Sequence, residues 1–286
     1  MALGVVGKTV YAGGHFISAG GDSDAHYVAY WNGSSWSPLG EYGVEGGYVE
    51  ALAIAGSDVY VGGSFVVAGN SSDNAYVARW DGSSWHALGS GLYDPVNALA
   101  AAGSDVYVGG YFEDAGGVLG ANYIARWNGT SWSKLGSFGP DGPVWAIAVG
   151  GSNVYAGGSF LNAGGTGNGA HIARWDGSAW HAMGSGLNGV VRQIEVVGPD
   201  VYAVGNFTNA GDDPDADYLA RWDGAAWHAV GTALNFQPVC LDVSGPDVYV
   251  GGNFTDAGGD PAADYFALWG SILRQIRMPL VLRDFP

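Results

Sequence analysis

Cysteine and basic side chains are scarce in this 286-residue chain. Cys240 is the single cysteine, so no intramolecular disulfide can form. Only 10 lysines and arginines stand against 27 acids, which gives a formal net charge of −17. Because phosphate binding needs clustered Lys and Arg, we expect no nucleic-acid partner.

Long apolar runs are also missing. No stretch of about 18 consecutive apolar residues occurs, so we expect no membrane-spanning helix. The first residues, Met1–Gly4, lack a basic segment followed by an apolar one. We therefore expect no signal peptide in this sequence.

Glycine and tryptophan are abundant, with 51 and 12 residues, and 48% of the chain is hydrophobic. A hydrophobic content this high excludes a disordered chain. Many glycines together with many aromatic residues are typical of short strands joined by tight turns. The composition therefore predicts a folded, all-β protein.

Two sequence markers recur in step along the chain. The first is a Val-Tyr-x-Gly-Gly-like segment, whose tyrosines are Tyr11, Tyr60, Tyr107, Tyr155, Tyr202 and Tyr249. The second is a Tyr-x-Ala-x-Trp-like segment, which ends at Trp31, Trp80, Trp127, Trp175, Trp222 and Trp269. Both series have spacings of 49, 47, 48, 47 and 47 residues, so the chain comprises six units of about 48 residues.

Each unit contains four strand-like segments, which we name A, B, C and D. In the third unit they are Val96–Ala102, Val106–Phe112, Tyr123–Trp127 and Trp132–Leu135. Gly-Ser-Asp or Gly-Pro-Asp joins A to B, and Asp-Gly or Asn-Gly joins C to D, which are strong hairpin signals. Six antiparallel four-stranded meanders predict a six-bladed β-propeller over residues 1–270, with an open solenoid as the alternative.

These markers carry a family resemblance. The double glycine after Val-Tyr, the Trp-ended strand and the Arg-Trp-Asp-Gly-Ser-Ser-Trp element at residues 79–85 resemble kelch and galactose-oxidase-like repeats. The chain looks closest to cortical polarity-marker propellers within that superfamily. The resemblance implies the fold strongly and the function weakly, because propellers perform many unrelated tasks.

The resemblance also raises the question of a copper oxidase. A galactose-oxidase-like site needs Tyr and His ligands and a Tyr–Cys crosslink. Cys240 occupies a position where most other units have alanine, which is typical of a small core residue. His86, His181 and His228 share one position of strand D and are therefore spread around the ring. We expect no copper chemistry.

The ends of the repeat depart from the pattern. Tyr30 and Leu268 replace the arginine before the strand-C tryptophan in the first and last units, so we expect the interface between these units to differ from the others. The tryptophan of strand D occurs five times, and a different segment, residues 271–286, follows Trp269. We expect this tail to supply the outer strand of the sixth blade, with a sorting or anchoring tail as the alternative.

The A–B and C–D turns lie on one face of such a propeller, and the B–C and D–A loops lie on the other. The turns are nearly identical between units, whereas the loops vary, and variable loops on a rigid scaffold usually carry binding. The loops hold 16 of the 27 acids and no Lys or Arg, which predicts a negative face.

Aromatic residues lie among the acids, namely Tyr42, Tyr48, Tyr93, Phe138, Trp145 and Phe236. Acids with exposed aromatics suit a carbohydrate or a protein ligand, whereas aromatics packed between blades would leave only a soluble acidic surface.

One loop suggests a metal. Asp213, Asp215 and Asp217 alternate, and such a spacing can wrap a calcium ion. The sequence lacks the glycine and the distal glutamate of an EF-hand loop. The alternative is that Asp217 and its counterparts Asp264 and Asn122 hydrogen-bond the loop backbone before strand C.

Strand A offers a second candidate site, near the central channel. One of its positions is Gly or Ala in four units but is Glu195 and Asp242 in the last two, with Arg192 and Gln193 nearby in sequence. Two acids near a channel predict a catalytic pair of a hydrolase or lyase, or a cation site. A water-filled channel also tolerates acids, and Arg192 would offset their charge.

The sequence thus favours a non-enzymatic, monomeric, extracellular or cell-surface propeller that binds carbohydrate or protein through its acidic loops. The alternatives are a hydrolase or lyase and a purely structural repeat module. Apart from calcium, we expect no cofactor.

Overall fold

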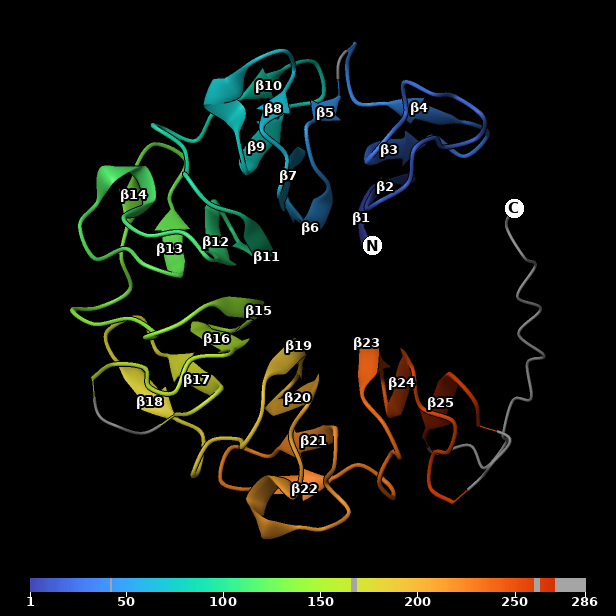
Figure 1. The fold of residues 1–286 in the computed structure, drawn as a ribbon, viewed down its shortest axis with the longest axis vertical. Coiled ribbons are helices and arrows are strands. Elements are labelled where there is room, and N and C mark those ends of the chain that lie inside the picture. Colours follow the sequence, from blue (N-terminus) through green and yellow to red (C-terminus); the bar gives the residue numbers. More distant parts are fainter. Residues whose placement is uncertain (42, 166–168, 260–262, 271–286) are drawn as a thin grey trace.

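The structure is a computed structural model, and it describes residues 1–41, 43–165, 169–259 and 263–270. Its sheets stand radially around a central axis, one sheet for each sequence unit (Figure 1). This arrangement confirms the predicted six-bladed β-propeller. No helix in the described part of the chain is long and apolar enough to cross a membrane.

Each blade begins at the axis and ends at the rim. The innermost strands, A, are β1 (Ala2–Val6), β6 (Val49–Ala55), β11 (Val96–Ala102), β15 (Val144–Gly150), β19 (Val191–Val197) and β23 (Pro238–Ser244). Strands B are β2 (Thr9–Gly13), β7 (Asp58–Gly63), β12 (Asp105–Gly110), β16 (Asn153–Gly158), β20 (Asp200–Gly205) and β24 (Asp247–Gly252). Strands C are β3 (Val28–Trp31), β9 (Val77–Trp80), β13 (Ile124–Trp127), β17 (Ile172–Trp175), β21 (Leu219–Trp222) and β25 (Phe266–Trp269). Strands D are β4 (Trp36–Pro38), β10 (Trp85–His86), β14 (Trp132–Ser133), β18 (Trp180–Ala182) and β22 (Trp227–Ala229).

Short elements lie in the loops between these strands. They are the strands β5 (Val44–Glu45) and β8 (Val67–Ala68) and the 3-10 turns η1 (Ser72–Asn74), η2 (Ala115–Gly117) and η3 (Ala210–Asp212).

All strand pairs within the blades are antiparallel, as the hairpin signals predict. Blades 1 to 5 have four strands, and the described part of blade 6 has three, in the order β23-β24-β25. The predicted closing strand of blade 6, residues 271–286, lies outside the described residues.

The double glycine allows neighbouring blades to approach closely. A Cβ atom at Gly109 would lie 2.7 Å from Val144 Cγ1 and 2.9 Å from Ile147 Cδ1 of the next blade. The branched side chains of one inner strand therefore occupy the space that the glycine of the preceding blade leaves open. In the fifth unit Val204 takes the place of this glycine, and the position that corresponds to Val144 is Pro238. The exception in the sequence thus has a matching change on the facing blade.

The strand-D tryptophans also join blades. In blades 2 to 5 the indole N–H donates to a backbone carbonyl at the rim of the preceding blade: Trp85 to Leu39 (2.9 Å), Trp132 to Leu88 (2.7 Å), Trp180 to Leu135 (3.0 Å) and Trp227 to Met183 (3.0 Å). The repeated tryptophan of the sequence is therefore an inter-blade contact as well as a core residue.

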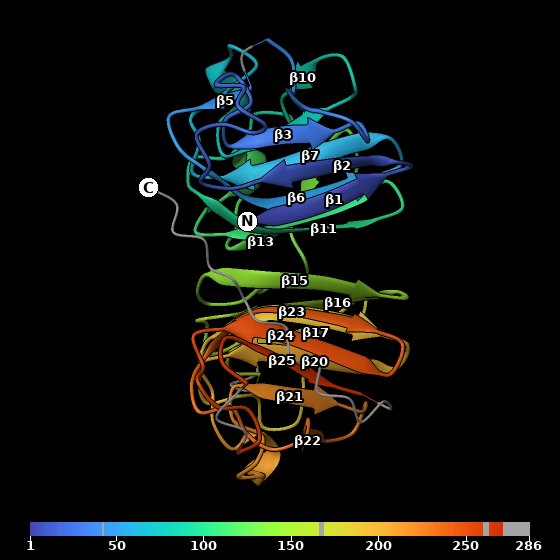
Figure 2. The same cartoon turned by 90° about the vertical axis from the view of Figure 1, so that its right-hand side faces the viewer.

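The contact between the first and last blades differs from the others, as we expected. Inner strands pack on one another from β1 through β23, but β23 makes no comparable contact with β1. Leu3 is 59% exposed, whereas Leu99 at the same position of blade 3 is 9% exposed. In the side view of Figure 2, which faces blades 1 and 6, strands β11 and β15 of the opposite blades are visible between them.

Candidate ligand-binding face

The B–C and D–A loops form a layer in which neighbouring loops are paired. Strand β5, in the D–A loop before blade 2, pairs with β8 in the B–C loop of that blade. Single bridges repeat this pairing at Pro140 with Ala163 and at Leu234 with Ala257. The loop layer is therefore a hydrogen-bonded platform that continues the repeat, more regular than the sequence suggested.

Side chains at one repeated loop position hold this platform together. Asp141 Oδ1 accepts hydrogen bonds from the backbone N–H groups of Leu161 (2.8 Å) and Asn162 (3.0 Å). Asn188 and Asn235, one and two units later, accept from the N–H groups of Thr208 (2.8 Å) and Thr255 (2.9 Å). Asp141 is thus one of the predicted loop acids with a structural role.

Two of the three aspartates of the calcium hypothesis accept hydrogen bonds from backbone N–H groups, and the third, Asp215, donates its own N–H to Asp213. Asp213 accepts from Asp215 (3.0 Å) and from Ala229 (3.3 Å), and Asp217 accepts from Asn209 (2.7 Å). Asn122 accepts from Asp114 in the same way, which confirms the backbone-bonding role for these two positions. Across the described ranges, no three His, Cys, Asp or Glu residues lie close enough to hold a metal ion. Calcium binding stays a prediction.

A repeated β-bulge places another set of side chains at the mouth of the central channel. The register shifts after the first residue of β6, β11, β15, β19 and β23. A bulge re-aims the extra side chain and is common beside functional sites. The residues at these bulges are Glu50, Asn97, Trp145, Arg192 and Val239.

Three blades contribute to an aromatic and cationic cluster at this mouth, which we call the channel-mouth cluster: Tyr111, Trp145 and Arg192. The guanidinium carbon of Arg192 lies 4.5 Å from the centroid of the Trp145 ring. Tyr111 meets Trp145 edge-to-face, with 5.8 Å between ring centroids. Trp145 Nε1, and Nδ2 of Asn97 at the preceding bulge, are buried without an acceptor among the described residues.

A second cluster joins blades 1 and 2. His15 stacks on Tyr48 with 4.0 Å between ring centroids, and its Nε2 lies 2.9 Å from Glu50 Oε1. Tyr27 packs edge-on against Tyr48 at 5.4 Å. His15 and Glu50 bond to each other, so fewer of their hydrogen-bonding groups are available to a ligand.

The structure brings together only some of the aromatics that the sequence singled out. Tyr48 and Trp145 enter the two clusters. Tyr93, Phe138 and Phe236 are exposed and make no ring contact with the described residues, and Tyr42 lies outside the described residues. Sequence reasoning missed Tyr111, His15, Glu50 and Asn97. Two repeated positions of the sequence identify them. His15 and Tyr111 follow a double glycine, and Glu50 and Asn97 are the middle residues of the Val-x-Ala segment that opens strand A.

Glu195 and Asp242 lie on the adjacent inner strands β19 and β23. Burial raises the pKa of Glu195, and the negative charge of Asp242 raises it further, to about 6. Gln193 bonds across the same interface, donating to the carbonyl of Leu241 (2.7 Å) and accepting from its N–H (2.9 Å). The two acids therefore lie on neighbouring blades and the charge of one acts on the other, while a catalytic or cation-binding role stays a prediction.

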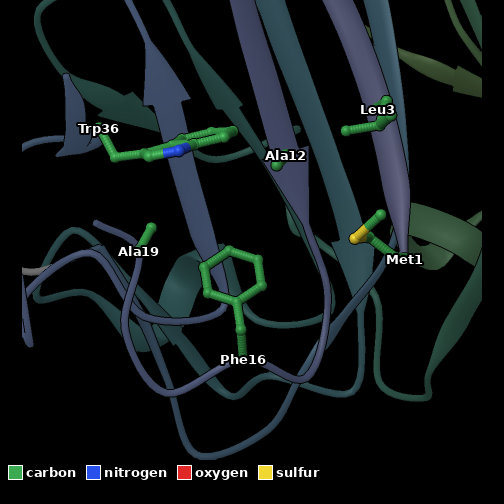
Figure 3. A pocket seen from close by; sticks show the side chains of 6 residues that line it. All are labelled: Met1, Leu3, Ala12, Phe16, Ala19 and Trp36. Carbon is green, nitrogen blue, oxygen red and sulfur yellow. The ribbon is translucent and has the colours of Figure 1, made fainter. Parts of the chain in front are cut away.

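An apolar pocket that the sequence did not suggest lies on blade 1. Figure 3 shows its lining side chains, which are Met1, Leu3, Ala12, Phe16, Ala19 and Trp36. It belongs to the face of blade 1 on which Leu3 is exposed. Its lining side chains carry no acid, base or hydroxyl group that could take part in catalysis.

Comparisons with known proteins support the fold. No family model matches the chain, and no curated protein matches it. The WD40 β-propeller domain of Doa1 superposes with a TM-score of 0.56 and 12% identity, covering 88% of this chain and 75% of that one. YCF48 bound to D1 peptide gives a TM-score of 0.50 and 12% identity, over 86% and 71% of the two chains. A chain of the nidogen/laminin complex gives 0.50 and 11%, over 86% and 85%. At these identities the likeness shows the fold alone.

Proposed function

We propose that this protein is a non-enzymatic, extracellular or cell-surface propeller that binds a carbohydrate or protein ligand on its loop face. The observation that carries the proposal is the channel-mouth cluster. Repeated bulges direct Trp145 and Arg192 to the loop face, and Tyr111 beside them is 41% exposed. Aromatic and arginine side chains that converge from several elements are typical of binding sites. YCF48 and the nidogen/laminin complex, similar in fold, are seen with peptide or protein partners.

A glycan array and a protein pull-down, each with the wild type and Trp145→Ala, test this proposal. We expect a ligand whose capture falls in the variant, while Trp36→Ala, on the remote pocket of blade 1, retains it. Capture that is equal in wild type and Trp145→Ala would place binding elsewhere. Protease shaving of intact cells tests the surface location, because an exposed propeller is released or cleaved.

A hydrolase or lyase is the second candidate, favoured by the raised pKa of Glu195 beside Asp242. A carboxyl group with a pKa near the working pH is suited to general acid catalysis. Turnover of any substrate that survives in both Glu195→Gln and Asp242→Asn would remove this candidate. The kelch-like kinship and a calcium ion at Asp213, Asp215 and Asp217 are further proposals, the latter tested by calcium titration of the thermal midpoint.

A further inference from the structure

We infer that the ligand of the channel-mouth cluster is a saccharide bearing a carboxylate, a uronic acid, whose carboxylate binds Arg192. The inference rests on the proposed function and names the class of ligand. It follows from the unpaired guanidinium of Arg192, from the rings beside it and from the acidic charge of the chain.

Arg192 differs from the other described arginines. Arg79, Arg126 and Arg221 pair with Asp58, Asp105 and Asp200 at 2.8–3.0 Å, and Arg174 donates to Asn153 (2.9 Å). Arg192 is exposed and forms no ion pair within the described part of the chain. Contact with the Trp145 ring orders the guanidinium and leaves its N–H groups available. A guanidinium presents a fork of donors that matches a carboxylate with two parallel hydrogen bonds.

Two further donors occupy bulge positions of the repeat, Trp145 in contact with Arg192 and Asn97 one blade before Trp145. Trp145 Nε1 and Asn97 Nδ2 are buried without an acceptor among the described residues. A buried donor without a partner is unfavourable, and such groups are rare in native proteins. Arginine and the tryptophan indole can only donate hydrogen bonds, as can an amide nitrogen. Because the exposed guanidinium of Arg192 only donates and has no ion-pair partner among the described residues, its ligand must present acceptors, and an anionic oxygen pair is the strongest acceptor for the fork.

The surrounding charge selects the rest of the ligand. With a net charge of −17, the protein repels an extended polyanion such as an acidic peptide. A uronic acid carries one carboxylate and several hydroxyl groups, which donate hydrogen bonds to Asp and Glu acceptors. Tyr111 supplies an exposed ring for the C–H face of the sugar. One carboxylate on a hydroxyl-rich body thus suits a single arginine within an acidic face.

Isothermal titration calorimetry with galacturonate, which carries one carboxylate, and with neutral galactose tests the inference. We expect the wild type to bind galacturonate at least about tenfold more tightly, as one bidentate charged pair can supply. Arg192→Gln should remove this preference, and Arg192→Lys should restore it only in part because lysine lacks the fork. The matched control is Arg174→Gln, which removes the same charge from a residue bonded to Asn153, and its preference should equal that of the wild type. Thermal unfolding of each variant verifies its folding.

Each other outcome overturns the inference. Equal affinity for both sugars, or a preference that survives in Arg192→Gln, shows that the carboxylate is not recognised there. Binding of a glutamate-rich peptide without binding of galacturonate assigns the site to protein ligands. In these cases Trp145-dependent capture on the arrays still supports the proposed function, whereas the loss of all Trp145-dependent capture refutes both.

Discussion

Trp132 of blade 3 donates its indole hydrogen to the carbonyl oxygen of Leu88 in blade 2, across 2.7 Å and in a buried position. Replacing Trp132 with phenylalanine keeps a ring in the core but leaves that carbonyl without its donor. Because an unsatisfied buried group costs about 1–3 kcal/mol, we expect Trp132→Phe to lower the free energy of unfolding by that amount. Urea unfolding monitored by circular dichroism measures the change.

Trp36→Phe is the matched control. Trp36 holds the same position in blade 1, where the described residues provide no acceptor for its indole. Its replacement should cost clearly less than that of Trp132. Equal losses would mean that ring volume, and not the inter-blade hydrogen bond, sets the effect.

Gly109 tests the close approach of neighbouring blades. An alanine Cβ there would meet Val144 at 2.7 Å and Ile147 at 2.9 Å, so the blades must shift apart. Overpacking of this kind typically costs about 1–3 kcal/mol, and we expect Gly109→Ala to destabilise the protein accordingly in urea unfolding.

The double variant Gly109→Ala/Val144→Ala separates a steric cause from a backbone cause. If the clash with Val144 is responsible, the two changes should couple favourably, so that the double variant loses less stability than the two single losses predict. Strictly additive losses would show that the glycine is needed for another reason.

The fold could be predicted from the sequence because its cause is local and repeated six times. The hairpin turns, the paired glycines and the strand-ending tryptophans each recur every 47 to 49 residues, and β11 begins and ends where the third unit predicts. The bond from Trp132 to Leu88 could not be predicted, since the register between blades depends on side-chain packing across the whole ring.

The candidate site was predicted only in part, and the β-bulge explains why. Alternation along a regular strand assigns each side chain to one side, but the shift between Val144 and Ala146 gives Trp145 a new direction. Tyr111 follows a double glycine and appears as an ordinary strand residue in the sequence. Asp141, by contrast, reads as a ligand-binding acid, yet it supports the B–C loop.

The segment 271–286 can be tested by deletion. In the described residues β25 is the outermost strand of blade 6, whereas in the other blades a fourth strand covers the strand at this position. If the segment supplies that fourth strand, its removal leaves the hydrogen-bonding edge of β25 uncovered, and the thermal midpoint should fall by several degrees, as about 1 kcal/mol shifts a domain of this size by roughly 2–4 °C. An unchanged midpoint in scanning calorimetry contradicts the closing-strand role.

Glu195 predicts a defined pH dependence. Its pKa in the folded protein, about 6, exceeds its ordinary value of 4.5, first because of burial and then because of Asp242. The folded state therefore holds this proton more tightly than the unfolded state, so the stabilising contribution is complete below pH 4.5 and is lost as the pH rises through 6. Glu195→Gln should accordingly match the wild type in stability near pH 4.5 and exceed it above pH 6.

The variant Asp242→Asn tests the second cause of the shift. It should lower the pKa of Glu195, which NMR titration of the Glu195 carboxyl carbon measures. A pKa that stays the same in Asp242→Asn would assign the whole shift to burial and weaken the case for these two acids as a coupled pair.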